Sequence, residues 1–309
     1  IVIAGPTASG KTGLSIALAK EIGGEIISAD SMQAYRLMDI GTAKVTEQEK
    51  EGVPHHLIDF INPDEPFNIH IFQKKAMEVI EDIHLRGKIP ILVGGTGFYI
   101  QSVVYNIQFD ETIKDTTDRK NLERLALEKG NTYVHQQLKE IDPLSYEKIH
   151  PNNIKRVIRA LEYHKQTGRA ISLHNEMESQ KTTPFNLLFY VLNMDRKMLY
   201  DRIDQRVEGM LEKGLLNEVE SLKARGYSQN LVAMQGIGYK ELYDHLEGRC
   251  TLAEAQEIIK RNTRHFAKRQ MTWFRREKEV IWLEVDPNSN NHENILSKIR
   301  KDIEVMGFM

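Results

Sequence analysis

An eight-residue loop near the start of the chain limits its fold more than any other feature. Residues 5–12 read GPTASGKT, which satisfies the pattern G-x-x-x-x-G-K-[ST] of a phosphate-binding loop. A short apolar run, Ile1 to Ala4, precedes the loop, and residues 10–22 follow it with helical periodicity. A strand, a glycine-rich loop and a helix in this order are typical of a parallel α/β sheet that binds an anion at the helix N-terminus.

The loop offers several kinds of phosphate ligand. Free backbone N–H groups and the positive end of the helix dipole face the anion, Lys11 adds a charge, and the Thr12 hydroxyl can coordinate Mg²⁺. The predicted phosphate site consists of Gly5, Pro6, Thr7, Ala8, Ser9, Gly10, Lys11 and Thr12. The loop alone leaves its ligand open between a nucleotide and the diphosphate of another ester.

Hydrophobic periodicity predicts a sheet domain that is interrupted in the sequence. Four more short apolar runs are predicted as buried strands, at residues 25–29, 89–93, 185–192 and 280–285. Residues 111–183 are charged, have helical periodicity and contain no convincing strand. We predict a P-loop NTPase-like parallel α/β core from residues 1–110 and 184–309, with a helical insertion domain at 111–183 and additional C-terminal helices.

Composition narrows the class of protein. The 42 Lys and Arg against 44 Asp and Glu leave a net charge of -2, so a polyanion would need a local basic surface. The single Cys250 cannot form an intramolecular disulfide, and no stretch approaches the roughly 20 apolar residues that cross a membrane. We expect a cytoplasmic monomer without a membrane partner. Because the chain begins at Ile1, we also expect its N-terminus to be trimmed.

A carboxylate is predicted at the edge of the sheet where ligands collect. Asp30 follows the strand at 25–29, and the glycine-rich segment 94–97 follows the strand at 89–93. Asp30 would then face the phosphate loop, and Ser31 and Gln33 could read base edges. Alternatively, Asp30 caps a helix that begins near Ser31. The glycines of 94–97 would allow either close approach to a ligand or a tight turn.

Two further groups of polar residues have alternative interpretations. Asp59, in the segment HHLID at 55–59, is a weaker candidate for binding Mg²⁺, and packing or capping is favoured for it and for His55 and His56. Arg202 and Arg206 lie four residues apart in a predicted helix. They could close over the phosphate loop as a cationic lid, or form surface salt bridges with neighbouring acids.

Two basic segments favour a nucleic acid as partner. Residues 260–278 contain eight Lys or Arg and one acid, which predicts a docked helix whose exposed face presents Lys260, Arg264 and Lys268. The second cluster lies in the insertion and comprises Lys155, Arg156, Arg159, Lys165 and Arg169. Either cluster alone fits a solvated helix face. Two of them in a chain with a phosphate site favour nucleic acid.

Several blocks along nearly the whole chain form a specific combination. The longer ones are DSMQAYR at 30–36, DIGTAK at 39–44, HHLID at 55–59 and GGTGFY at 94–99; shorter ones lie at 86–90, 156–162, 167–169, 237–241 and 267–270, with Trp273. Together with the phosphate loop, they closely resemble the bacterial tRNA dimethylallyltransferases. Val45, Gly236 and His265 depart from the family pattern, in which Pro, Ala and Gln are common at these positions.

The resemblance implies a transferase that moves the dimethylallyl group of dimethylallyl diphosphate to N6 of the adenosine at tRNA position 37, beside the anticodon. It implies catalytic roles for Asp30, Thr12 and Arg206, Mg²⁺ held through Thr12, and the anticodon stem-loop as partner. The tRNA contacts carried over by motif fall on Asp30, Ser31, Met32, Gln33, Thr96, Arg119, Lys155, Arg156, Val157, Ile158, Arg159, Gln235, Gly236, Ile237, Gly238, Tyr239 and Lys240.

The residues themselves leave two other functions open. A small-molecule kinase would use Asp30 as the base for a hydroxyl, and Arg202 and Arg206 as a clamp on the γ-phosphate. It does not explain the two basic segments. A nucleotide-switched RNA-binding protein needs those segments but gives Asp30 no chemical role.

Overall fold

The structure, a computed structural model, describes residues 1–109, 117–286 and 291–307. The chain divides into two compact units. Unit 1 comprises Ile1–Val104 and Phe185–Met309, and unit 2 comprises Tyr105–Pro184. The sheet domain is therefore assembled from two separate stretches of sequence.

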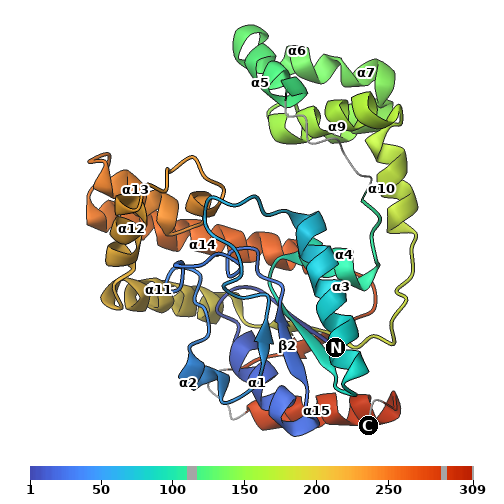
Figure 1. The fold of residues 1–309 in the computed structure, drawn as a ribbon, viewed down its shortest axis with the longest axis vertical. Coiled ribbons are helices and arrows are strands. Elements are labelled where there is room, and N and C mark those ends of the chain that lie inside the picture. Colours follow the sequence, from blue (N-terminus) through green and yellow to red (C-terminus); the bar gives the residue numbers. More distant parts are fainter. Residues whose placement is uncertain (110–116, 287–290, 308–309) are drawn as a thin grey trace. The chain divides into compact units, whose positions relative to one another are not determined.

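Unit 1 is built on a six-stranded sheet whose strand pairs are all parallel, in the order β3-β2-β4-β1-β5-β6 (Figure 1). The strands are β1 (Val2–Ala4), β2 (Glu25–Ser28), β3 (His55–His56), β4 (Pro90–Gly94), β5 (Phe189–Asn193) and β6 (Val280–Glu284). The predicted α/β class is confirmed. Strand β3 was not predicted, because two half-buried residues carry no readable periodicity.

Helices cover both faces of the sheet, as the alternation of its side chains requires. They are α1 (Lys11–Ile22) and α15 (Asn291–Val305) on one face, and α3 (Ile69–Leu85) and α4 (Gly97–Val104) on the other. Ile3, Ile91 and Tyr190 point into the core formed with α1 and α15. Leu92 points the other way and lines a small cavity with Ile80 of α3.

A second helical layer lies in the C-terminal half of unit 1. It consists of α11 (Arg196–Glu212), α12 (Leu215–Ala224), the 3-10 turn η1 (Ala233–Gln235), α13 (Tyr239–Leu246) and α14 (Leu252–Phe274), while the short α2 (Glu47–Lys50) follows the β2 loop. Val207, Leu242 and Ile259 of these helices pack with Tyr35 of that loop in a core of their own. In the part of the chain that the structure describes, no helix is both long and apolar enough to cross a membrane.

Unit 2 is helical throughout its regular structure in the described range 117–184. Its helices are α5 (Thr117–Lys129), α6 (Asn131–Gln136), α7 (Leu138–Ile141), α8 (Pro143–Lys148), α9 (Ile154–Thr167) and α10 (Ile171–Ser179). Pro143 starts α8 after its N-cap, Asp142, whose carboxylate accepts the Ser145 N–H at 3.0 Å. A core that includes Val134, Leu138 and Leu161 holds the helices together.

Candidate functional site

The phosphate loop joins β1 to α1 and opens at the helix N-terminus. Gly10, the N-cap, has a φ of 95°, a left-handed conformation that favours glycine. The first intrahelical bond runs from the Leu14 N–H to the Gly10 carbonyl. Among the described residues, the N–H groups of Gly10, Lys11 and Thr12 have no hydrogen-bond acceptor. They leave the donors that an anion at this helix end requires.

Lys11 lies within the loop that it is predicted to serve. Its Nζ donates to the carbonyl oxygens of Gly5, at 3.1 Å, and Pro6, at 2.7 Å. The pKa of Lys11 is lowered from 10.5 to about 7, mainly by loss of hydration and to a smaller extent by the charge of Arg206, while the charge of Asp30 acts in the opposite direction. The charge on Lys11 is therefore poised near neutral pH.

Asp30 directly follows the last pairing residues of β2 and faces two cations. One carboxylate oxygen accepts the Met32 N–H at 2.9 Å. Burial raises the pKa of Asp30 above its usual value, while the Met32 N–H and the charges of Lys11 and Arg206 act in the opposite direction. No helix begins near Ser31, because residues 31–34 form a turn that Asp30 stabilises, and Asp30 interacts electrostatically with Lys11 of the phosphate loop. A desolvated carboxyl group with a raised pKa is a stronger base.

Arg202 of α11 contacts the phosphate loop, and Arg206 of the same helix interacts electrostatically with Lys11 and Asp30. The Nε of Arg202 donates to the Ala8 carbonyl at 2.9 Å, as the cationic lid predicted. Arg206 is partly buried; loss of hydration lowers its pKa, whereas the charge of Asp30 raises it. Asp195, an acid that precedes these arginines in the sequence, caps α11 by accepting the Lys197 N–H at 2.9 Å. Lys11, Asp30 and Arg206 interact with one another electrostatically, and we call them the charge triad.

The glycines after β4 are explained by contacts within the protein. A Cβ on Gly94 would lie 2.4 Å from a carbonyl oxygen in the backbone that follows β2. On Gly95 it would lie 2.1 Å from Nε2 of Gln270, and on Gly97 2.2 Å from the ring of Trp273. These glycines therefore allow a close approach, as the sequence suggested, but what approaches them is neighbouring backbone and two side chains of α14.

Glu218 of α12 organises the segment that follows the β2 loop. Its Oε2 accepts the N–H groups of Asp39, at 2.9 Å, and Ile40, at 2.8 Å, and its Oε1 accepts that of Gly41 at 3.1 Å. The Tyr239 hydroxyl donates to the same carboxylate. Sequence reasoning missed Glu218, which lies far along the chain from the DIGTAK block. This carboxylate replaces an external anion on three consecutive amides.

Gln33 is held on both sides of its amide. Its Oε1 accepts the Ser28 hydroxyl at 2.8 Å, and its Nε2 lies 3.2 Å from the Thr42 carbonyl and 3.4 Å from that of Ala43. The predicted reading of a base by Gln33 would compete with these bonds. Within the structure, Gln33 connects β2 to the DIGTAK segment.

The HHLID segment is structural. His56 Nε2 lies 2.8 Å from an oxygen of the buried Glu25, and the His55 ring bonds a backbone carbonyl at 2.8 Å. Asp59 pairs with Lys44, whose side chain is 4% exposed. The favoured packing role matches these contacts, and Asp59 already has a cation as its partner.

Several residues predicted to contact tRNA lie beside Asp30. The Ser31 N–H donates to the Thr96 hydroxyl at 3.4 Å, which joins the exits of β2 and β4. A Cβ on Gly236 would lie 2.5 Å from the Met32 methyl group, so the glycine that replaces the common Ala gives Met32 room. Ser31, Met32, Thr96 and Gly236 are all partly exposed and form one rim beside Asp30.

Four other residues of the predicted tRNA-binding set are buried, and a fifth is paired within the protein. Tyr239 is 1% exposed, and in unit 2 Val157 and Ile158 are 0% and 3% exposed. Their side chains lie in hydrophobic cores rather than on the surface, although the residues belong to motif blocks. Gly238 is also buried, and Arg119 is exposed but bonds Glu162 through Nε and Nη2, at 3.1 and 2.7 Å. The predicted residues left exposed on these helices include Lys155, Arg156 and Lys240.

The basic face of α14 also differs from the prediction. Lys260 is 9% exposed and pairs with Glu208 at 2.7 Å, and Arg264 pairs with Asp204 of α11 at 2.5 Å. The exposed cations of this segment are Arg261, Lys268, Arg269, Arg275, Arg276 and Lys278. In the described residues, none of these six has an ion-pair partner. The name α14 cations refers to these six, of which Arg275, Arg276 and Lys278 directly follow the end of α14.

Thr12 is the residue of the phosphate loop that was predicted to hold a magnesium ion. Thr12 is exposed, and its hydroxyl has no hydrogen-bond partner among the described residues. The same residues contain no group of three or more His, Cys, Asp or Glu placed to hold a metal. This arrangement fits Mg²⁺, which often keeps waters and is bound through substrate phosphates rather than by a cage of side chains.

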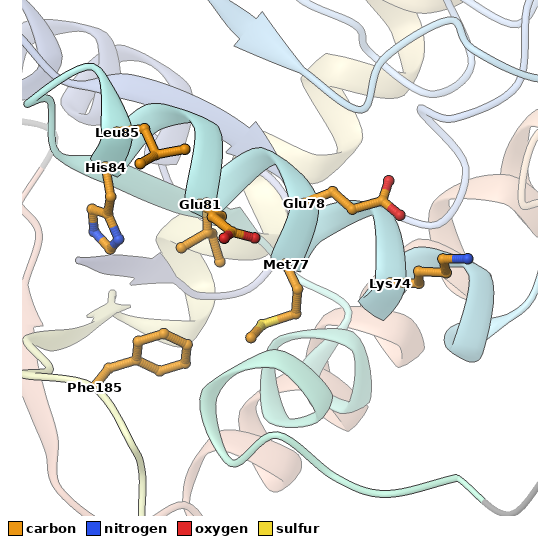
Figure 2. A pocket seen from close by; sticks show the side chains of 8 residues that line it. Lys74, Met77, Glu78, Glu81, His84, Leu85 and Phe185 are labelled. Carbon is orange, nitrogen blue, oxygen red and sulfur yellow. The ribbon is translucent and has the colours of Figure 1, made fainter.

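Two hollows on unit 1 lie apart from these residues. One is a groove of about 590 Å³ along α3, where Figure 2 shows Met77, Glu81, His84 and Phe185 around it. The other, of about 350 Å³, is lined by Ile80, Pro90 and Val103 among others. No predicted site residue lines either hollow. The candidate site is therefore defined by its charges and loops.

A six-stranded parallel α/β sheet with a phosphate-loop motif between β1 and α1 defines a P-loop-like fold. Comparison with known proteins is specific. A family model described as IPP transferase matches residues 33–277, and one described as isopentenyl transferase matches residues 1–62. The chain belongs to this family of transferases.

Individual relatives agree over nearly the whole chain. The tRNA dimethylallyltransferase of Lachnoclostridium phytofermentans is 55% identical over 97% of this chain and 96% of its own, and that of Acetivibrio thermocellus 53% over 99% and 98%. Among solved structures, the tRNA isopentenylpyrophosphate transferase of Bacillus halodurans is 45% identical with a TM-score of 0.74, over 99% of this chain and 97% of its own. A eukaryotic dimethylallyltransferase acting on tRNA is 33% identical with a TM-score of 0.84, over 99% and 79%.

Proposed function

We propose that this chain transfers the dimethylallyl group of dimethylallyl diphosphate to N6 of the adenosine at tRNA position 37 and releases diphosphate. The observation that supports this most is the charge triad, in which Asp30 faces Lys11 and Arg206 beside an open phosphate loop. One arrangement supplies both a base and a cationic site for a leaving diphosphate. A tRNA substrate also implies a cytoplasmic enzyme, and we propose that it acts as a monomer.

Asp30 would accept the proton in this reaction. An exocyclic adenine amine is barely basic, so its proton must leave as the C–N bond forms. The nitrogen attacks the allylic carbon, the C–O bond to diphosphate breaks, and the proton passes to an Asp30 carboxylate oxygen. The raised pKa of Asp30 favours that transfer.

The phosphate loop would stabilise the leaving diphosphate. Negative charge grows on the bridging oxygen as the C–O bond breaks, and Lys11, Arg206 and the amides of the α1 N-terminus oppose it. Mg²⁺ bound through Thr12 would neutralise part of the diphosphate charge. Arg202, which donates to the Ala8 carbonyl, would hold the loop in the shape that presents those amides.

The RNA would be bound over a wider surface. A base stacked in an anticodon loop must be splayed out to reach Asp30. The rim formed by Ser31, Thr96, Met32 and Gly236 adjoins that position. The α14 cations, and Lys155 and Arg156 in unit 2, would contact the RNA backbone, since phosphates are bound by exposed unpaired cations.

A labelling experiment separates this proposal from its two alternatives. Unmodified tRNA is incubated with the protein, Mg²⁺ and either dimethylallyl diphosphate labelled in the allyl group or ATP labelled in the γ-phosphate. The proposal predicts that allyl label alone enters tRNA, at N6 of adenosine 37, when the nucleosides are analysed. Transfer of γ-phosphate to an acceptor would indicate a kinase. Binding of tRNA without either label would indicate an RNA-binding protein.

A further inference from the structure

Gln270, near the C-terminal end of α14, bonds two separate loops at the candidate site. Its Oε1 accepts the Thr7 N–H at 2.9 Å, and its Nε2 donates to the Gly95 carbonyl at 2.9 Å. The side chain comes from 263 residues further along the chain than Thr7 and is 6% exposed. A buried amide with both ends satisfied by backbone is a rigid connection between the phosphate loop and the exit of β4.

The bond to Thr7 divides the phosphate loop into two parts. The Thr7 N–H donates to Gln270. The N–H groups of Gly10, Lys11 and Thr12 have no acceptor among the described residues. The first part is therefore fastened to the protein, and the second part remains for an anion. A loop that is fixed before binding loses less entropy when it closes on its ligand.

The exit of β4 is shaped to admit this side chain. A Cβ on Gly95 would lie 2.1 Å from Nε2 of Gln270, which excludes any other residue at position 95 while the bond is present. The same turn carries Thr96, whose hydroxyl accepts the Ser31 N–H next to Asp30. Gln270 thus touches the diphosphate side and the acceptor side of the candidate site through two bonds.

We propose that Gln270 is a positioning residue, which sets the phosphate loop against the β4 exit so that the diphosphate and the acceptor base meet at the charge triad. This inference rests on the proposed function. Gln270 bonds only protein backbone in the structure, so it acts through Thr7 and Gly95 rather than on a substrate.

Two substitutions test the two bonds separately. Gln270→Met keeps length and removes both bonds, leaving two buried backbone groups without partners. Gln270→Glu keeps an acceptor for the Thr7 N–H. At neutral pH its second carboxylate oxygen is anionic and repels the Gly95 carbonyl, whereas the protonated carboxylic acid can again donate a hydrogen bond to that carbonyl. Gln256→Met is the matched control, because Gln256 lies on the same helix away from both loops.

The probe is inorganic diphosphate with Mg²⁺, and its Kd is measured by calorimetry beside the Kd for tRNA. We expect Gln270→Met to weaken diphosphate binding roughly 5- to 100-fold, the range for buried groups left unpaired, with the Kd for tRNA within twofold. Gln270→Glu should bind diphosphate poorly at pH 8 and approach the wild-type value as the pH falls toward 5, compared at each pH with the wild type. Gln256→Met should match the wild type.

Two results would overturn the inference. One is wild-type diphosphate binding by Gln270→Met and Gln270→Glu at pH 8. The other is an equal loss of diphosphate and tRNA affinity with a matching fall in Tm, which would mean that Gln270 only holds the fold together. A wild-type protein that binds no diphosphate would instead reject the phosphate site itself, and the proposed function with it.

Discussion

The charge triad and the basic segment of α14 both contain several cations, but the structure uses them in opposite ways. Lys11 and Arg206 are desolvated around one carboxylate, and loss of hydration lowers the pKa of each. On α14, Lys260 and Arg264 pair with acids of α11, and other cations of the segment remain exposed. The role of a cation therefore depends on whether it is buried and whether it is paired with an acid. The number of cations in a segment does not predict that role.

The comparison assigns chemistry to the triad and RNA binding to the α14 cations. The largest expected effect follows from replacing Asp30 by Asn. Asn can still accept the Met32 N–H, so the turn persists, but it cannot take a proton. We expect kcat for allyl transfer to fall about 10²- to 10⁴-fold, with the KM for tRNA within a few fold. Steady-state kinetics, with the exposed Asp64→Asn as control, measures this.

Replacing Arg206 by Ala should have the next largest effect. If Arg206 meets charge that appears only as the C–O bond breaks, kcat should fall on the order of 10²- to 10³-fold and more than the KM for dimethylallyl diphosphate rises. Arg206→Lys should recover part of the loss, because ammonium restores charge without a planar fork. Arg196→Ala, on the same helix, is the control. A wild-type kcat in Arg206→Ala would remove it from the triad.

The triad also predicts a pH dependence. The pKa of Lys11 is lowered to about 7, and a diphosphate prefers the protonated form. Affinity for diphosphate should therefore be full below pH 7 and decrease up to about tenfold per pH unit above it, relative to a variant that stays charged. Lys11→Arg is that variant, because guanidinium keeps its proton. Calorimetry between pH 6 and 9 would reject the assignment if both proteins followed one curve.

The smallest effects are expected on α14, and they should depend on which cations are removed. Lys268→Ala with Arg269→Ala removes two exposed charges and should weaken tRNA binding about threefold to tenfold, with a salt slope smaller by about 1.5 to 2. Lys260→Ala with Arg264→Ala removes paired charges and should leave that slope unchanged. Binding titrations at several salt concentrations compare them. Equal slopes in the two double variants would contradict the division between paired and exposed cations.

Much of the site was predictable because its chemistry lies close to sequence motifs. A strand, the GPTASGKT loop and a helix fix Lys11 and Thr12 locally, and the strand before Asp30 places it at the same sheet edge. The contact of Arg202 with the loop was one of two interpretations that the sequence left open, the other being surface salt bridges. The buried Val157 and Ile158 could have been separated from Lys155 by helical periodicity, but the motif block was carried over whole.

Partners distant in sequence were not predictable. Gln270 meets Thr7, and Glu218 meets the amides of residues 39–41, only because the second helical layer docks on the sheet edge. The pairing of Lys260 with Glu208 depends equally on how α14 packs against α11. A polar residue at 270 on the apolar face of α14, between Ala267 and Phe274, was the one available signal.

The division between triad and α14 is tested most directly by measuring the single-turnover rate of allyl transfer at saturating substrates together with the Kd for tRNA. Wild type, Asp30→Asn and the Lys268→Ala, Arg269→Ala double variant are compared in one experiment. We predict that Asp30→Asn loses rate by about 10² or more with near-normal Kd, and that the double variant loses affinity with near-normal rate. Loss of rate in the double variant at saturation, or a normal rate in Asp30→Asn, would contradict the division.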